Sequence, residues 1–334
     1  MQSKKLVLLA AAFAALPGVV WANQIPPFGA ASAYNLFAVG SSSLVGDVTT
    51  GADVGGRVAA AGTVTGGQFG STIGSSIVND PFGTGLTNAI VTAGGLTSGS
   101  TFFVNGGGNV STPTTTGTIF FNDGGSRTVT NTPGIDFATL RSSLDSLTTQ
   151  LAGMGQTGTI RAGQSSLGEN PSWLVLQGGA GVNYFNLTAA QFASATLDIE
   201  VPTGATVIIN VDGTSDTLGN AIFVNGVQTH GDSNLNEDIL FNFADATSVD
   251  ISNGLDASVL APFALLTDNG GQIDGNFIAA QIDITGDGEV HNVEFTGTLP
   301  DPDPPASTPE PATLALMGTG LLGIAGALYR RVKA

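Results

Sequence analysis

Short apolar runs rich in β-branched residues recur through most of the chain and are punctuated by Gly, Asn and Asp. Such runs predict many brief strands, and turns such as Asp123–Gly125 and Asp268–Gly271 separate them. Many brief strands joined by Gly and Asn corners are typical of a β-solenoid, in which each coil buries its apolar face on the next. The spacing shows no fixed repeat, so a β-sandwich stays open as the alternative.

One segment departs from this pattern. Five apolar residues recur at intervals of three and four positions: Phe137, Leu140, Leu144, Leu147 and Leu151. This spacing predicts an amphipathic helix over Asp136–Ala152, with Asp136 as its amino-terminal cap and Gly153 at its end. The helix must bury its apolar stripe against a sheet, or else bind a partner. A shorter helix is predicted after Thr188, because Gln191 completes a capping box.

The amino terminus has the pattern of a secretory signal peptide. Lys4 and Lys5 precede an apolar run over Leu6–Leu16, and small residues stand at the −3 and −1 positions of a cleavage site after Ala22. We therefore predict a signal peptide over residues 1–22. A retained amino-terminal anchor is the alternative.

The carboxyl terminus combines Pro309-Glu310-Pro311, an apolar stretch over Ala312–Leu328 and a basic end. The apolar stretch would rise roughly 26 Å as a helix, enough to cross a membrane with slight thinning, and the basic end should stay in the cytoplasm. This tripartite tail over residues 309–334 resembles the PEP-CTERM sorting signal of Gram-negative bacteria. The resemblance implies an exosortase-type processing enzyme as partner and Pro309, Glu310 and Pro311 as the sorting motif. A plain membrane anchor at 312–328 is the alternative.

The exported part carries a strong negative charge. Only four of the nine basic residues, all arginine, lie outside the two terminal segments, against 25 of the 26 acidic residues, so its net charge is near −21. Such a surface repels nucleic acid, which we exclude as a partner. Cysteine is absent, so disulfides and thiolate metal sites contribute nothing. Residues 301–308, rich in Pro and Asp, predict an extended spacer between the domain at 23–300 and the sorting signal.

Short sequence segments follow one another along this domain in a characteristic order: Tyr34–Phe37, Gly56–Gly62, Ile135–Phe137, Ile208–Val211, Leu240–Phe243, Leu260–Pro262, Gly275–Ala279 and Gly288–Asn292. Their order resembles the choice-of-anchor A domain, a bacterial surface module, although Ala61 stands where that family has Gly. The resemblance implies an adhesive or matrix-associated role, linked to exopolysaccharide or biofilm, and no catalytic residues. It also implies a β-helix similar to ice-binding β-solenoids.

The domain offers few residues for catalysis. It has two histidines, His230 and His291, and neither lies in a nucleophile motif. His291 follows Glu289 in a predicted strand, so the two should face one side as a metal ligand pair, an acid/base pair or a hydrogen-bonded structural pair. Arg57 should pair with a carboxylate rather than bind a ligand. We predict that the protein is not an enzyme.

Calcium is the one cofactor that the sequence suggests. Asp232, Asn234, Asn236 and Asp238 place oxygen ligands at alternate positions, as the start of a calcium loop does, although Glu237 replaces the turn glycine. The acidic segment Asp283–Glu289 is similar. Solvated turn residues are the alternative in both places.

Threonine pairs on single strand faces raise ice binding as a further interpretation. Thr63 and Thr65 form one pair, and Thr128 and Thr130 form another. Two isolated pairs are too few for a flat array, and threonine is common in strands by propensity alone. The sequence therefore does not favour ice binding.

These observations predict a mainly β protein: an irregular β-solenoid (β-helix) with one amphipathic helix packed alongside, plus an N-terminal signal peptide and a C-terminal transmembrane helix. It should be exported as an inner-membrane-anchored precursor and then reach the cell surface or extracellular matrix. There we expect a structural or adhesive role, with exopolysaccharide as partner. A calcium-dependent carbohydrate-binding module is the alternative.

Overall fold

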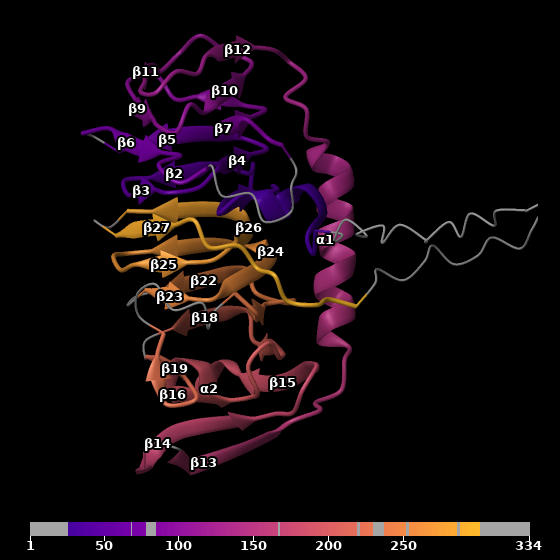
Figure 1. Ribbon diagram of the computed structural model, residues 1–334. Coiled ribbons are helices and arrows are strands. Elements are labelled where there is room, and N and C mark those ends of the chain that lie inside the picture. The colour runs from indigo at the N-terminus through magenta and orange to yellow at the C-terminus, as the bar shows by residue number, and fades with distance from the viewer. Residues whose placement is uncertain are drawn as a thin grey trace, which may run out of the picture.

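The computed structural model describes residues 26–67, 69–77, 85–165, 168–218, 221–229, 237–251, 254–285 and 288–300. Figure 1 shows a tall stack of strands with one long helix alongside. The expected signal peptide with its cleavage site at Ala22, the spacer 301–308 and the sorting segment 309–334 lie outside the described residues. Within the described part, no helix is both long and apolar enough to span a membrane.

The largest sheet is mainly a ladder of parallel strands. In spatial order it runs β12 (Arg127–Val129), β10 (Asn109–Thr112), β7 (Asn88–Thr92), β4 (Val58–Ala60), β1 (Leu36–Ala38), β26 (Phe277–Ile284), β24 (Ser258–Asp268), β21 (Ile239–Asn242), β17 (Thr206–Asp212) and β15 (Val182–Thr188). The long strands β24 and β26 continue into a second branch. That branch runs β8 (Gly95–Leu96), β5 (Thr63–Gly66), β2 (Val48–Thr50), β26, β24, β22 (Ser248–Ile251) and β18 (Ser215–Leu218).

Two further sheets complete the stack. One runs β11 (Thr118–Phe121), β9 (Thr101–Val104), β6 (Ser71–Ile73), β3 (Asp53–Val54), β27 (Glu289–His291), β25 (Ile273–Asp274) and β23 (Leu255–Asp256). The other runs β13 (Thr159–Ser165), β14 (Gly168–Gln177), β16 (Thr196–Glu200), β19 (Ile222–Val224) and β20 (Val227–Gln228). In the described residues, antiparallel pairing occurs only between β13 and β14 and between β19 and β20. A β-sandwich is built from antiparallel sheets, so this alternative does not hold.

Successive strands of the chain join three ladders in turn: the first branch of the largest sheet, its second branch, and the sheet from β11 to β23, which we call the third ladder. Strands β4, β5 and β6 pair in parallel with β1, β2 and β3, and β7, β8 and β9 pair with β4, β5 and β6 in turn. This first half grows away from β1 as far as β12. Helix α1 (Phe137–Ala152) then returns along the stack, and the second half grows back from β15 until β26 and β27 meet β1, β2 and β3.

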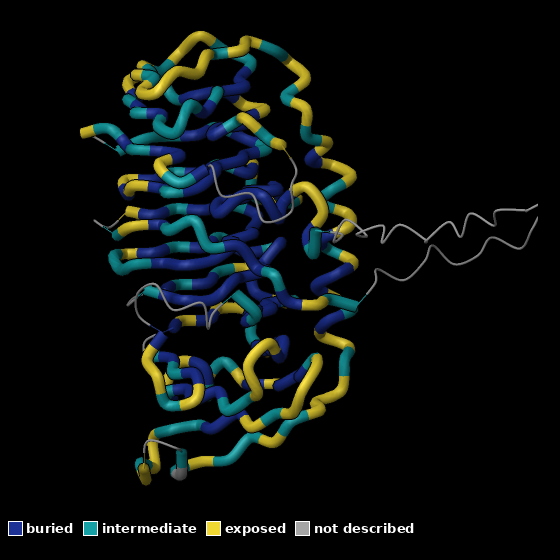
Figure 2. Tube along the Cα trace, in the orientation of Figure 1, coloured by how far each residue is buried: buried dark blue, intermediate teal, exposed yellow. Residues whose placement is uncertain are grey.

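Alternation along each strand produces the core. Residues that face the stack interior, such as Val48, Val64, Ile282, Leu266 and Val249, are at most 1% exposed and form one continuous cluster. Their neighbours along each strand point outward. Figure 2 shows that buried residues fill the ladders, whereas exposed residues concentrate at the turns. Each fully buried aliphatic side chain contributes about 1.5–3 kcal/mol, which offsets the conformational entropy lost in so many short strands.

The predicted amphipathic helix forms within one residue of its expected start. The Asp136 carboxylate accepts a hydrogen bond from the Thr139 amide (3.1 Å), and Gly153 follows the last turn. Leu144 and Leu151 are buried in a second apolar cluster, against the outward side of the largest sheet. The short helix α2 (Ala189–Ser194) has the capping box expected from Thr188 and Gln191.

An asparagine ladder holds the carboxyl half of α1. Asn242 donates to the side-chain oxygen of Asn210 (2.9 Å), and Asn210 donates to that of Asn186 (3.0 Å). Asn210 also donates to the Leu151 carbonyl (2.9 Å). The Leu151 carbonyl is one of the last four of the helix, which have no partner within it. The Met154 amide also donates to this carbonyl (3.1 Å), so the ladder adds a further hydrogen bond at the buried helix end and fixes the helix to the sheet.

We expect Leu144→Asp to lower the free energy of unfolding by about 3 kcal/mol or more, because it buries an unpaired carboxylate against the sheet. Urea titration followed by circular dichroism measures this change. Ser146→Asp, on the exposed side of the same helix, is the matched control and should be nearly neutral. Equal midpoints for the two variants would show that the helix is not docked.

Candidate functional site

A regular row of polar side chains crosses the second branch of the largest sheet. It consists of Thr97, Thr65, Thr49, Asp283, Thr267, Asp250 and Thr217, one from each successive strand position; we call it the threonine–aspartate rank. From Thr65 to Thr217 each lies in register with the next, and Thr97, which directly follows β8, has its hydroxyl 2.6 Å from that of Thr65. With strands about 4.8 Å apart, the rank extends about 29 Å.

The buried residues on either side of the rank members in the sequence show which way the side chains of the rank point. Thr49 stands between the buried residues Val48 and Thr50, and Asp283 stands between Ile282 and Ile284, so both point away from the core. Because the strands are hydrogen-bonded to one another along the whole branch, the spacing between successive side chains of the rank is fixed. The arrangement presents hydroxyl and carboxylate groups at one repeat distance along a regular surface.

Most of this row was not predicted from the sequence. Thr63 and Thr65 were expected to form an isolated pair, and that expectation is wrong for Thr65. The pair Thr128 and Thr130 lies elsewhere, because Thr128 is in register with Ser111 on the helix-covered ladder. No strand was predicted at Thr49 or Thr97, and the strand register that aligns the two residues is not a local feature of the sequence.

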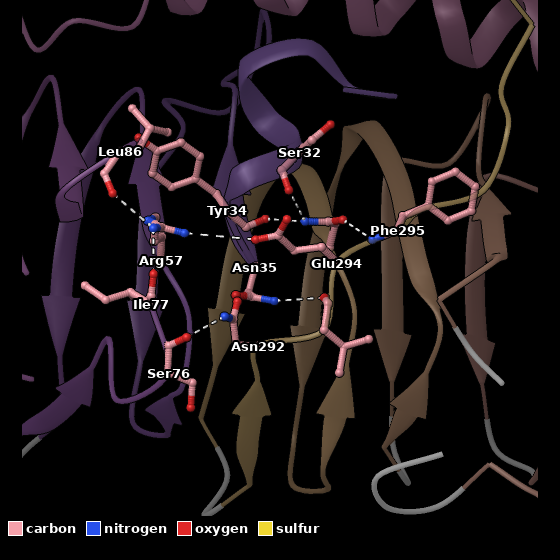
Figure 3. A network of polar contacts seen from close by, with 12 residues as sticks. Ser32, Tyr34, Asn35, Arg57, Ser76, Ile77, Leu86, Asn292, Glu294 and Phe295 are labelled. Atoms are coloured by element: carbon pink, nitrogen blue, oxygen red, sulfur yellow. Dashed lines mark hydrogen bonds and ion pairs between the residues drawn. The ribbon is translucent and has the colours of Figure 1, made fainter. Parts of the chain in front are cut away.

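Arg57 lies in a buried polar network where the two halves of the stack meet (Figure 3). Its guanidinium donates to the carbonyls of Ile77 (2.8 Å) and Leu86 (3.1 Å), and it lies 4.0 Å from the Glu294 carboxylate. Both side chains of this ion pair are almost completely buried. The predicted pairing of Arg57 with a carboxylate is therefore present.

Two buried asparagines complete this network. The Asn35 amide lies 3.0 Å from the carbonyls of Gly275, His291 and Val293, whereas Asn276 donates to the carbonyls of Ser32 (3.0 Å) and Tyr34 (2.7 Å). Each asparagine therefore binds backbone from the opposite half of the stack. These interactions fix the fold at the junction and leave no open position for a ligand around Asn35 or Asn276, which are fully buried.

An acidic cluster surrounds His291 on the third ladder. Asp256, Asp274 and His291 are in register on β23, β25 and β27. The His291 ring contacts Asp274 through Nδ1 (2.7 Å) and Glu289 through Nε2 (3.1 Å). The predicted pairing of Glu289 with His291 is therefore present. Both ring nitrogens face carboxylates, so the arrangement suits a clamped imidazolium rather than a general base poised toward a substrate.

Protonation of this cluster changes near neutral pH. Burial, together with the charge of Asp274, raises the pKa of Asp256 to about 7. Burial lowers the pKa of His291, but its hydrogen bond to Glu289 and the charge of Asp274 outweigh this effect, so the net shift is upward. Both groups hold protons more tightly in the folded state than in the unfolded chain.

The expected calcium ligands are only partly visible. Asp232, Asn234 and Asn236 lie outside the described residues, as does His230. Asp238 accepts a hydrogen bond from Thr296 (3.4 Å), and burial raises its pKa. Asp283 lies in the threonine–aspartate rank, and Glu289 lies in a different sheet. Among the described residues, no group of three or more His, Asp or Glu side chains is placed to hold a metal ion.

The fold and the rank define a class of protein. A stack of parallel ladders that presents a long, regular polar row is suited to the recognition of an extended surface rather than of a small molecule in a cleft.

Comparison with known families identifies the chain more closely. Residues 27–292 match the family described as "Putative Ice-binding-like adhesive domain", so the chain belongs to this family. Residues 307–331 match the PEP-CTERM protein-sorting motif. The predicted PEP-CTERM sorting signal is thereby confirmed, and exosortase processing is implied; the roles of Pro309, Glu310 and Pro311 stay a prediction. The chain is an exported, cell-surface protein with a domain from a non-catalytic, adhesive family.

A solved structure with some similarity is the ice-binding protein from the Antarctic ascomycete Antarctomyces psychrotrophicus, with 12% sequence identity and a TM-score of 0.38. The alignment covers 81% of this chain and 98% of that one. No curated protein gave a significant match.

We expect the free energy of unfolding to fall as the pH rises from about 5 to 8.5, because folding holds a proton on Asp256 that the unfolded chain releases above its ordinary pKa of 3.8. Asp256→Asn should remove that cost and raise the Tm at about pH 8.5 by about 3 °C or more, with a smaller gain at about pH 5. Thermal melts at both pH values measure this.

The control for this measurement is Asp245→Asn, which removes the same charge from an exposed position. It should leave the pH dependence of the Tm unchanged. If both variants shift the melting curve alike at both pH values, the effect is one of net charge and the acidic cluster has no part in it.

Proposed function

We propose that this protein is an adhesin of the cell-surface matrix and that its domain binds a polysaccharide through the threonine–aspartate rank. The observation that carries the proposal is the register of seven polar side chains across successive strands. A repeating polymer can contact a repeating row at several points at once, and many weak contacts then add to firm retention.

The chemistry of the rank favours sugars. Threonine hydroxyls both donate and accept hydrogen bonds, and the carboxylates of Asp283 and Asp250 form stronger, charge-assisted bonds with sugar hydroxyls. Ice binding is less well supported, since these two aspartates place charges within the row. The negative charge of the protein favours a neutral polysaccharide, because acidic polymers would be repelled.

We infer that the ladders form a single β-solenoid within residues 23–300, bounded by the signal peptide 1–22 and the spacer 301–308. The rotation of the chain through the ladders supports this architecture. The order of segments over Tyr34–Asn292 supports the narrower assignment to the choice-of-anchor A domain. On this view, a membrane helix over 312–328 anchors the precursor until an exosortase acts at Pro309–Pro311.

A calcium-dependent carbohydrate-binding module is the second candidate. Asp238 is the last of the four proposed ligands, after Asp232, Asn234 and Asn236, and Glu237 precedes it; burial raises the pKa of both carboxyl groups. A divalent cation bound by these ligands would relieve the cost of holding the two charges near the fold. Asp238 is not a member of the threonine–aspartate rank, so this candidate site and the rank can be tested separately.

We expect Thr49→Val combined with Thr267→Val to weaken binding to a neutral polysaccharide at least tenfold, because the two hydroxyls on either side of Asp283 would be lost while the shape of the strands is kept. Affinity gel electrophoresis in galactomannan and hydroxyethylcellulose measures the retardation. Thr149→Val, on the exposed side of α1, is the control and should bind like the unaltered protein.

The same gels, run with calcium and with EDTA, separate the two candidates. Binding that resists EDTA and is lost in the Thr49→Val and Thr267→Val double variant supports the rank. If EDTA abolishes binding, and replacing Asp232 and Asn234 with Ala does the same, the calcium module is correct instead.

We expect Glu310→Ala to leave unprocessed precursor in the membrane fraction, because the sorting motif would no longer be recognised. Intact-mass analysis of the protein from an exosortase-containing host measures this maturation, with Thr308→Ala as a neighbouring control. Normal maturation of the Glu310 variant would rule out recognition through this motif.

A further inference from the structure

We propose that a stacked phenylalanine pair at the end of the third ladder, Phe103 and Phe120, is a second binding site, and that it takes a sugar ring of a neutral polysaccharide. The two residues are in register on β9 and β11. Their ring centroids are 5.3 Å apart and their planes are inclined by only 16°, so the rings are stacked in parallel. The site lies on a different ladder from the threonine–aspartate rank.

One ring of the pair is open to solvent. Phe120 is 51% exposed, and its strand β11 is the last of its sheet among the described residues. Phe103 therefore supports one side of the Phe120 ring, and no paired strand covers the other side. The open side of the Phe120 ring, stacked on a second ring, is an apolar surface that a ligand can cover.

Polar side chains flank the rings on both sides. Thr118 and Thr101 precede the two phenylalanines by two positions, and Asn122 and Asn105 follow them by two, so all six side chains share the outward face. The Asn122 amide donates to the Asn105 side-chain oxygen (2.8 Å). An apolar column thus stands between a column of hydroxyls and a column of carboxamides.

This arrangement matches the chemistry of a pyranose ring. Such a ring has a face of C–H bonds, which packs on the negative face of an aromatic ring, and hydroxyls at its edges, which need donors and acceptors. The only arginine beside β11 in the described residues, Arg127, already donates to the carbonyls of Thr115 and Gly117 (both 2.7 Å). The guanidinium of Arg127 is therefore bound to the backbone ahead of β11, and the strong negative charge of the exported part disfavours an acidic sugar at this site.

Gly70 allows the Phe103 ring to pack closely against the backbone. At Gly70, with φ of +94°, an added Cβ would lie 2.6 Å from the Phe103 ring. The absence of a side chain lets that ring lie against the backbone, where it is held as a rigid base for Phe120. A rigid aromatic surface loses little conformational entropy when a ligand binds.

This inference adds to the proposed function without depending on the rank. Two glycan sites on different ladders of one domain would let a single molecule join two polymer strands. The two sites can therefore be tested separately, because substitutions at Thr49 and Thr267 leave the phenylalanine pair intact.

The test compares Phe120→Leu, Phe120→Trp and Val227→Leu in the full exported domain. Leucine keeps an apolar side chain but lacks a ring face, so its retardation in hydroxyethylcellulose gels should fall at least fivefold. Tryptophan should keep or increase the retardation. Val227, an exposed apolar residue on β20, is the control and should show no change.

Equal retardation of the leucine variant and the unaltered protein would overturn the proposal. Retardation by alginate but not by neutral glycans would also overturn it, since the site would then take an acidic polymer. Light scattering after gel filtration tests for self-association. A dimer that the leucine variant abolishes, in a protein that does not bind glycan, would show that a second copy of the chain covers the pair.

Discussion

The pairing of β1 with β26 is the contact on which the rest of the stack depends. It joins two halves that grow from distant parts of the sequence, and β2 and β3 extend the same joint onto β26 and β27. A slip of one residue here would turn every side chain of one half to the wrong face. The buried asparagines oppose such a slip. Asn35 and Asn276 each bind carbonyls of the opposite half, and a slipped register would leave these polar groups unpaired at a cost of about 1–3 kcal/mol each.

The ion pair of Arg57 with Glu294 acts in the same way. A buried ion pair adds little net stability, because desolvation of both charges offsets their attraction. Its loss on mispairing would nevertheless leave a charge buried alone, which is strongly unfavourable. The carbonyls of Ile77 and Leu86 provide the arginine with further partners that only the correct arrangement supplies. The network therefore selects one register more than it strengthens the fold.

The proposed binding face exists only if this joint forms. Thr97, Thr65 and Thr49 come from the first half of the chain, whereas Asp283, Thr267, Asp250 and Thr217 come from the second. Thr49 and Asp283 are the neighbours at the boundary, through the pairing of β2 with β26.

The same fact explains what the sequence could predict. Helix α1 depends on the spacing of nearby leucines and on a local cap at Asp136, so its limits were predictable within one residue. The brief strands and the capping box at Thr188 were also local features. The rank depends on which strand lies beside which, and no local pattern specifies that Thr49 lies beside Asp283. The contact of His291 with Glu289, two residues away, was predicted, whereas its contact with Asp274 on another strand was not.

The topology also decides where the domain is tethered. Because the two halves meet in the middle of the stack, the described ends of the domain meet there as well: the rings of Phe28 and Phe295 are 5.4 Å apart. Both belong to the apolar cluster under α1, so the chain leaves the domain from the helix-covered side. The threonine–aspartate rank and the phenylalanine pair lie on the other ladders. The described carboxyl end therefore lies against the helix-covered ladder, whereas both proposed binding surfaces lie on other ladders, so the domain can be tethered through one ladder and bind through the others.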